Sequence, residues 1–368
     1  MRSLLIGNGI DIQFGGKDYL NRNIIKRAVE NLYSDIFNPE AYPKEIGQWF
    51  VHLYCEFTKV LKGEYNQYIA TSYDKKFIKD LNKRYKKKKK YKYTEIGIED
   101  YLFIHDLFCR KNRIFNPEQF VFRETFKRWI LDSIYNNGKI NDIHDRFPMK
   151  LKEFFSSYDN IFTTNYDTNI TKFSGQDVYY LHGAFHILSY IYDKDSFRNK
   201  LSDSPVKECP VIEGCEHLFS TALMSFTGEL KSYSMDVAHN SNEAITKFAE
   251  GMELNPDIAK DIETWKDDSN YIVRNMYEAI MLKRKDKGLV FKEQYPIEKF
   301  KSIKEQIDLV GLSPTNDTHL FELINKNDKI NTVCFYYFDK RDIPDIRKAF
   351  NKKKIVVLSI KECWLKYQ

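Results

Sequence analysis

Six short apolar runs along the chain predict strands. Most of them are continuous stretches of aliphatic and aromatic residues, without regular alternation of apolar and polar positions. This pattern is typical of parallel strands, because helices cover both faces of a parallel sheet and bury its side chains. The predicted strands span residues 3–6, 160–164, 178–181, 307–310, 332–338 and 355–358.

Segments with helical spacing separate these strands. Residues 318–327 and 343–351 lie between the last three strands, which predicts the alternating elements of a doubly wound α/β sheet. Two longer helical tracts, at residues 20–150 and 216–290, interrupt this alternation. Their apolar residues recur at helical spacing and are expected in the core, among them Phe122, Phe126, Trp129, Ile130 and Ile134, then Ile272, Met276 and Ile280. Asn137 and Gly138 predict a helix end.

These patterns predict a single α/β domain, a Rossmann-like parallel sheet with large helical insertions. The sheet core is expected from residues 1–20, 155–190 and 300–368. The helical insertions are expected at residues 21–154 and 191–299. Within the second insertion, residues 194–214 contain two prolines and little periodicity, which predicts a loop or a lid.

Polar clusters follow four of the predicted strands. Ligands of an open parallel sheet bind beyond the carboxyl ends of its strands, so we expect these clusters to converge on one edge. Each cluster alone also fits a tight turn, a helix cap or a loop histidine. Their succession at strand ends favours a nucleotide site. The clusters contain Gly7, Asn8, Gly9 and Asp11; Thr164, Asn165 and Asp167; His182 and Gly183; and Ser313, Asn316 and Asp317.

Four motifs around these clusters occur in the order found in sirtuin-like proteins. They read LLIGNGIDIQFGG, FTTNYDTNI, YYLHGAFH and LVGLSPTNDTHLFELI. They look most like the bacterial sirtuin-like and AbiH-type abortive-infection proteins. The resemblance covers the predicted sheet core and implies a sirtuin-like NADase domain. It implies catalytic roles for Asn165, beside the nicotinamide ribose, and His182, as the base. It implies cofactor-binding positions for Gly7, Asn8, Gly9, Asp11, Thr164, Asp167, Gly183 and Ser313.

Two features of true sirtuins are missing from the sequence. The paired zinc cysteines are absent, since Cys209 and Cys215, with His217 nearby, are the only candidates and no second close pair follows. The acyl-lysine segment after the catalytic histidine is also not evident. Both departures weigh against protein deacylation, and no metal is expected.

The resemblance therefore implies an NAD+ glycohydrolase of an antiphage defence system, which depletes cellular NAD+. Cleavage passes through an oxocarbenium-like state, and nicotinamide leaves as a neutral molecule without a general acid. Asn165 would position a ribose hydroxyl and a water, and His182 would accept a proton. Backbone N–H groups of the turn at residues 7–9 would bind the pyrophosphate. Asp11 would either bond a ribose hydroxyl or cap the following helix.

Other functions remain open. An NAD-dependent protein deacylase would need acyl-lysine for NAD+ turnover, whereas a non-catalytic NAD or ADP-ribose sensor would not need His182. The basic run from Lys83 to Tyr93 offers a weak nucleic-acid contact, although a solvated lysine-rich loop explains it more simply. A dehydrogenase is disfavoured because the third glycine of its fingerprint is missing.

Composition limits the class of protein. A hydrophobic content of 42% with 15% aromatic residues predicts a folded globular chain, and the net charge is +6. Six scattered cysteines fit a reducing cytoplasm, and no signal peptide is expected. No apolar run approaches the roughly 20 residues of a membrane helix. A homo-oligomer or a defence-system partner protein is expected to control such an NADase.

Overall fold

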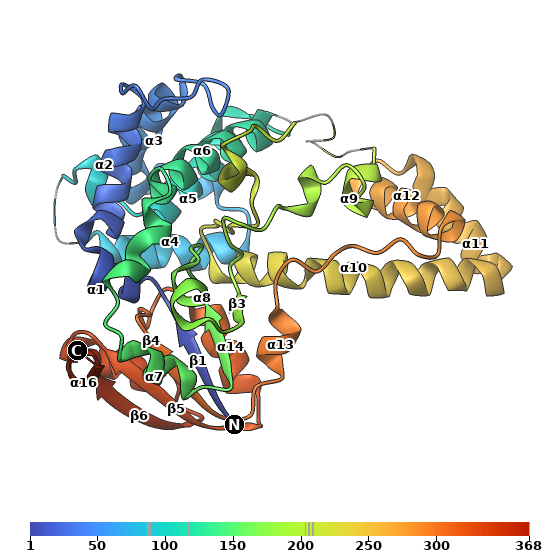
Figure 1. Cartoon of the computed structure of the whole chain (residues 1–368). Coiled ribbons are helices and arrows are strands. Elements are labelled where there is room, and N and C mark those ends of the chain that lie inside the picture. Colours follow the sequence, from blue (N-terminus) through green and yellow to red (C-terminus); the bar gives the residue numbers. More distant parts are fainter. Residues whose placement is uncertain are drawn as a thin grey trace.

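A six-stranded, all-parallel sheet forms the centre of the protein, in the order β3-β2-β1-β4-β5-β6. The computed structural model describes residues 1–86, 88, 90–116, 118–202, 204, 207 and 210–367. The strands are β1 Arg2–Ile6, β2 Asn160–Thr163, β3 Val178–Tyr180, β4 Glu305–Val310, β5 Ile330–Tyr337 and β6 Lys354–Ser359 (Figure 1). The predicted fold class is confirmed, and each predicted strand lies within about two residues of its observed bounds.

The apolar runs form this sheet because both of its faces are covered. Side chains alternate between the two faces, and all three apolar residues at 4–6 of β1 are fully buried. Leu4 and Ile6 pack into the largest apolar cluster, with the N-terminal helices. Leu5 packs into a second cluster on the opposite face, with α13 Ile297–Lys301, α14 Thr318–Lys326 and α15 Ile343–Ala349. The predicted helices between the last strands are therefore confirmed.

The first helical insertion lies above the carboxyl ends of the strands (Figure 1). Its main helices are α2 Asn21–Asn31, α3 Ile46–Leu61, α4 Ser72–Arg84, α5 Ile98–Asn112 and α6 Glu118–Tyr135. In α6, the predicted core residues Phe126, Trp129 and Ile130 are buried, whereas Phe122 is 36% exposed and stacks on Trp49. The helix ends where positive φ angles begin, at Asn136, Asn137 and Gly138.

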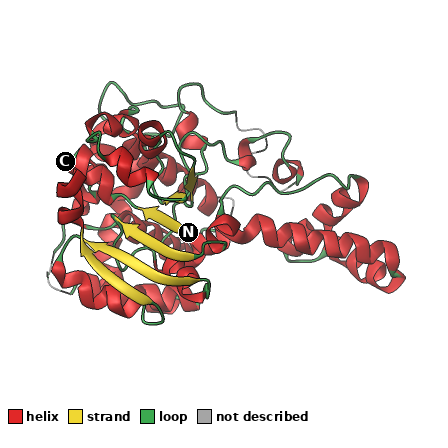
Figure 2. Ribbon diagram, turned by 60° about the horizontal axis from the view of Figure 1, so that its bottom comes forward, coloured by secondary structure: helices red, strands yellow, loops and turns green. Residues whose placement is uncertain are grey.

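The second insertion forms an arm that projects from the body of the molecule (Figures 1 and 2). The arm consists of α10 Gly228–Leu254, α11 Pro256–Glu263 and α12 Tyr271–Lys285. Thr227, Asn255 and Asn270 cap these helices by accepting hydrogen bonds from backbone N–H groups of the first turns. In α12, Ile280 is buried but Ile272 is 59% exposed, so its predicted core position is wrong: Ile272 lies in the first helical turn, two residues after the capping residue Asn270.

The described residues of the segment predicted as a loop or lid include a short helix, α9 Phe197–Lys200. Phe197 and Leu201 are buried in a third apolar cluster with the arm, and Phe197 stacks on Phe291 with ring centroids 4.5 Å apart. Apolar contacts with the arm thus order the beginning of this segment. None of the described helices has the length and apolar composition that a membrane crossing requires.

Candidate functional site

The loops after β1 and β4 meet at the carboxyl edge of the sheet. A Cβ atom at Gly9 would lie 2.4 Å from the Cα of Gly311, so only glycine allows this approach. The N–H groups of Gly7 and Gly9 donate to the carbonyl oxygens of Val310 and Gly311, both at 2.9 Å. The two predicted glycines therefore have a structural role in joining the loops at the centre of the sheet. Between β1 and β4, the direction in which successive strands are added to the sheet reverses.

Asp11 and Asn165 form a hydrogen-bonded pair at this edge. Both side chains are buried, and the Nδ2 group of Asn165 donates to Asp11 Oδ2 at 2.8 Å. Asn169, just after the second cluster, donates to Asp11 Oδ1 at 3.4 Å. The sequence left open whether Asp11 caps a helix. In the structure its carboxylate, in the first turn of α1 Gly9–Gly15, accepts from these two amides.

The environment of Asp11 makes its carboxyl group a weak acid. Burial raises its pKa well above the usual range, and the nearby carboxyl group of Asp167 raises it further. Burial also raises the pKa of Asp167, whose Oδ1 accepts from the backbone N–H of Asn169 at 2.8 Å. Asn165 Oδ1 is buried and has no hydrogen-bond partner among the described residues. This acceptor is suited to a hydroxyl group or a water.

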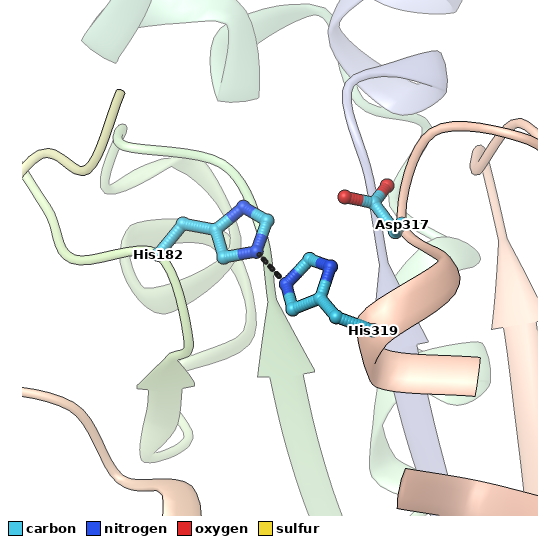
Figure 3. Close-up of side chains that lie close together, drawn as sticks. All are labelled: His182, Asp317 and His319. Carbon is cyan, nitrogen blue, oxygen red and sulfur yellow. Dashed lines mark hydrogen bonds between the residues drawn. The ribbon is translucent and has the colours of Figure 1, made fainter. Parts of the chain in front are cut away.

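His182 faces a second histidine that the sequence analysis missed. Its Nε2 lies 3.0 Å from Nε2 of His319, and the two rings are nearly parallel (Figure 3). Both side chains are 4% exposed. Burial lowers the pKa of His182 well below its usual value and that of His319 to about 3. Both imidazoles are therefore neutral near pH 7, and one donates to the other.

A lysine from the arm adds charge beside the histidine pair. Lys231, in the first turn of α10, is 8% exposed and forms an ion pair of 2.6 Å with Glu99. Its charge lowers the pKa of both histidines further, after burial. Burial raises the pKa of Asp317 to about 6, and Lys231 opposes this shift. The carboxylate of Asp317 lies with the histidines in a group close enough to hold a metal (Figure 3). The adjacent ammonium disfavours a cation there.

Two cavities lie between this edge and the first insertion. The first has a volume of about 530 Å³ and is lined by Asn8, Tyr166 and Asn316 from the strand-end loops, by Lys231, and by residues of the insertion. The second, of about 600 Å³, shares Asn316 and Arg84 with the first. Asn8 is the predicted site residue that reaches these cavities.

The two predicted catalytic side chains lie beneath the first cavity. Asn165 is 7% exposed, and it does not line either of these two cavities, nor does His182. The segment between them and the cavity is linked by hydrogen bonds. The hydroxyl of Tyr166 donates to the carbonyl oxygen of Leu223 at 2.6 Å, and the backbone N–H of Leu223 donates to the carbonyl oxygen of His182 at 2.9 Å. The structure therefore places both residues close to the cavity but covered.

The remaining predicted site residues have different surroundings. Thr164 is half-buried at the end of β2, where its N–H donates to the carbonyl oxygen of Ile6. Gly183 has a φ of +76°, and a Cβ atom there would lie 2.1 Å from the carbonyl oxygen of Thr221. Ser313 contacts the hydroxyl of Thr315 at 3.1 Å in the loop after β4. These residues belong to the same edge, but none of the three lines either cavity.

The cysteine and lysine segments follow their own packing. Cys209 lies outside the described residues, and His217 bonds Asp132 with Nε2 at 3.1 Å from Oδ1. In the basic run, Tyr85 and Tyr91 pack against each other with ring centroids 4.9 Å apart. Lys88 pairs with Glu95 at 2.6 Å. The tyrosines of this run thus contribute to the apolar packing of the first insertion.

No family model, no curated protein and no solved structure matches this chain. The resemblance to sirtuin-like proteins therefore stays a prediction from four motifs. The function must be argued from the residues at the carboxyl edge of the sheet.

Proposed function

We propose that the protein hydrolyses the bond between nicotinamide and ribose in NAD+, and that it belongs to the sirtuin-like NADases. One observation carries this proposal. Asn165 is held by Asp11 at the carboxyl edge of a Rossmann-type sheet and offers a buried oxygen that has no hydrogen-bond partner in the described part of the chain. A ribose hydroxyl or a water would supply the missing donor.

The proposed reaction uses the two neighbouring histidines as a base. Asp11 orients Asn165, because an oxygen of its carboxyl group accepts from Nδ2 of Asn165 and leaves Oδ1 of Asn165 for a ligand. The oxygen of a water bonds to C1′ of the ribose as the C1′–N bond breaks and its electron pair leaves with neutral nicotinamide. The water's proton passes to the His182–His319 pair, which is neutral before the reaction.

The burial of Asn165 and His182 favours a second candidate function. A module that binds NAD+ or ADP-ribose without cleaving it would not need to expose these side chains. Hydrolysis requires the covering segment around Tyr166 and Leu223 to move when the nucleotide binds. The two functions therefore differ in turnover, not in the nucleotide that they bind.

The first test is NAD+ hydrolysis by the purified chain, by Asn165→Ala, and by Asn240→Ala, which changes an exposed residue of α10. We expect the first variant to lose the release of nicotinamide and the second to retain it. Thermal unfolding of each variant controls for folding, because Asn165→Ala removes a buried hydrogen bond worth about 1–3 kcal/mol. Wild-type turnover by a folded Asn165→Ala would refute the assignment. ADP-ribose binding without any cleavage would establish the sensor.

The proposed role in antiphage defence rests on the motif resemblance alone. It predicts that cells expressing the wild-type chain lose NAD+ on phage infection and that cells expressing Asn165→Ala do not. Equal NAD+ levels in the two infected cultures would contradict the proposed role in defence.

A further inference from the structure

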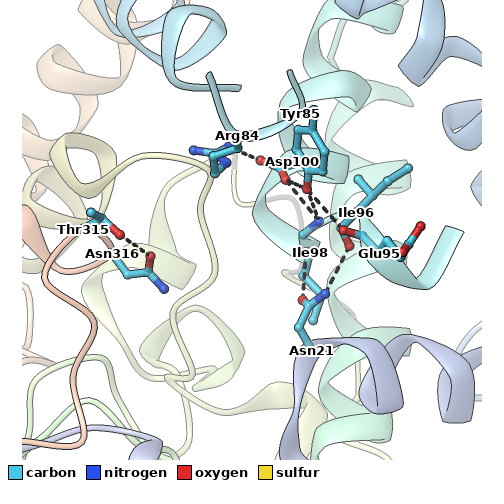
Figure 4. A network of polar contacts seen from close by, with 10 residues as sticks. Asn21, Arg84, Tyr85, Glu95, Ile96, Ile98, Asp100, Thr315 and Asn316 are labelled. Carbon is cyan, nitrogen blue, oxygen red and sulfur yellow. Dashed lines mark hydrogen bonds and ion pairs between the residues drawn. The ribbon is translucent and has the colours of Figure 1, made fainter. Parts of the chain in front are cut away.

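The two cavities meet at a single arginine of the first insertion. Arg84 ends α4 and lines both cavities, as does Asn316 from the loop after β4. Figure 4 shows its guanidinium group between Asp100 on one side and the Thr315–Asn316 turn on the other. A ligand that extends from one cavity into the other must therefore pass this guanidinium group.

Neighbouring residues fix the position of Arg84. Its Nη2 group pairs with the buried carboxylate of Asp100, and its guanidinium lies 5.1 Å from the ring centre of Phe77. The hydroxyl of Tyr85 and the backbone N–H of Gly97 donate to the other oxygen of Asp100. The Arg84 side chain is still 46% exposed. The arginine is thus held in place while part of it faces the cleft.

Each cavity has a chemistry that suits one end of a dinucleotide. The first is lined by three tyrosines, Tyr19, Tyr85 and Tyr166, and by carboxylates that include Glu99. Aromatic faces attract a cationic ring such as a pyridinium. The lining contains the two cations Lys231 and Arg84, but its three carboxylates outnumber them: Glu95, Glu99 and Asp100. The first cavity also lies beside the His182–His319 pair, where the end of the dinucleotide that reacts must lie.

The second cavity contains basic residues as well as an apolar wall. Lys83 and Lys348 line it together with Phe321 and Ala349, and three acidic residues balance the charge: Asp80, Glu322 and Asp345. Because the basic and acidic residues of this lining are equal in number, its net charge does not attract an anion. An anion would instead bind to one cationic group that is held in place. Arg84 is that group, since its planar guanidinium can bind phosphate oxygens in pairs.

We propose that the two cavities form one cleft for a dinucleotide and that Arg84 contacts its diphosphate. The nicotinamide end occupies the first cavity and the adenosine end the second. This inference rests on the proposed function for the identity of the ligand, and it assigns a role to the first insertion. The start of the basic run then belongs to the wall of a nucleotide site.

The test measures binding of ADP-ribose by calorimetry to the wild type, Arg84→Gln and Asn316→Asp. Arg84→Gln removes the positive charge that pairs with the buried Asp100, so its unfolding is measured as well. Asn316→Asp places a negative charge at the same junction on an exposed loop residue. Asn240→Asp adds the same charge to α10, outside both cavities. Nicotinamide riboside, which has no phosphate, is the control ligand.

We expect both cleft variants to weaken ADP-ribose binding by about tenfold or more, as for the loss of a charge-assisted contact. Asn240→Asp should bind as the wild type does, and nicotinamide riboside should bind all four proteins alike. Unchanged ADP-ribose affinity in Asn316→Asp, or no binding by the wild type at millimolar concentration, would overturn the proposal. NAD+ cleavage is assayed separately. If NAD+ is cleaved but both cleft variants bind ADP-ribose as the wild type does, the cleft is wrong and the proposed hydrolysis stands. If ADP-ribose binding depends on Arg84 but NAD+ is not cleaved, the proposed hydrolysis is wrong and the cleft stands.

Discussion

At the scale of single residues, the site depends on pairs that are distant in the sequence. Asp11 and Asn165 are 154 positions apart, and His182 and His319 are 137 apart. The strand-end rule predicted that the first three of these residues share one edge. It missed His319, which lies in the first turn of a predicted helix, because helical periodicity does not show which side chain of that turn faces the edge.

We predict that His319→Ala lowers kcat by about tenfold to a hundredfold with little change in KM, since in the proposed reaction the pair accepts the proton from water. His319 also contributes to the lowered pKa of His182. Its removal should raise that pKa, so the acid limb of the pH–rate profile should move to higher pH. Steady-state kinetics from pH 4.5 to 9 measure both effects.

His186→Ala is the matched control, because His186 is exposed and lies in the same loop after β3 as His182. It should leave the profile unchanged. A His319→Ala profile that coincides with the wild-type profile would show that His319 only fills space beside His182.

Asp317 gives a prediction about stability and pH. Its folded-state pKa of about 6 lies above the usual value of 3.8, so its contribution to stability is complete below pH 4 and is lost as the pH rises through 6. Asp317→Asn removes this loss. Relative to the wild type, the variant should gain at most roughly 3 kcal/mol between pH 4 and 7.5, at 1.36 kcal/mol per pKa unit. Urea unfolding at both pH values measures the gain, and an equal difference at the two values would contradict it.

At the scale of elements, the strands were predictable because the apolar runs are continuous and both sheet faces are covered. The meeting of the loops at one edge was also predictable, because such runs indicate parallel strands, and the carboxyl ends of parallel strands lie at the same edge of a sheet. Lys231 and Arg84 were not predicted as site residues, since they come from helical insertions. Sequence periodicity marks the apolar side of such a helix but not which part of the molecule its polar residues reach.

The junction of the β1 and β4 loops predicts a strong effect of Gly9→Ala. The added methyl group would lie 2.4 Å from Gly311 Cα, which is backbone and cannot rotate away. We expect a loss of about 1–3 kcal/mol, as for other overpacked sites. Thermal or urea unfolding of the variant provides the measurement.

Gly251→Ala is the control for this substitution. Gly251 lies inside α10, and a Cβ atom there would make ordinary contacts of 3.4–3.5 Å with Ile258. Alanine in a helix interior should stabilise the protein by about 0.5–1 kcal/mol. If both variants shift stability in the same direction, the close approach of the two loops does not limit the fold.

At the scale of the whole molecule, three apolar clusters divide the structure. Two of them share the sheet, whereas the third lies in the arm and includes Ala249, Ile262 and Ile280. Among the described residues of the three arm helices, those that reach the sheet clusters lie at the base of α10, Leu230 in the first cluster and Met235 in the second. The arm therefore has fewer contacts that would couple its unfolding to that of the sheet.

This division predicts the order of local opening. Backbone amides of α11 and α12 should exchange with solvent at a lower free energy than amides of β1 and β4. Native-state hydrogen exchange with increasing denaturant measures these values. A single opening free energy for all four elements would show that the arm and the sheet unfold together.

The helix α10 joins the outer end of the arm to the histidine pair. It is continuous over 27 residues, about 40 Å at 1.5 Å per residue, and its first residue, Gly228, packs against the ring of His319. Lys231 lies in the same turn. A rigid helix of this kind acts as a lever: when its outer end is pushed, its inner end turns unless the helix bends. A force on the arm would therefore be transmitted to Lys231 and to His319, one of the two histidines that accept a proton in the proposed reaction.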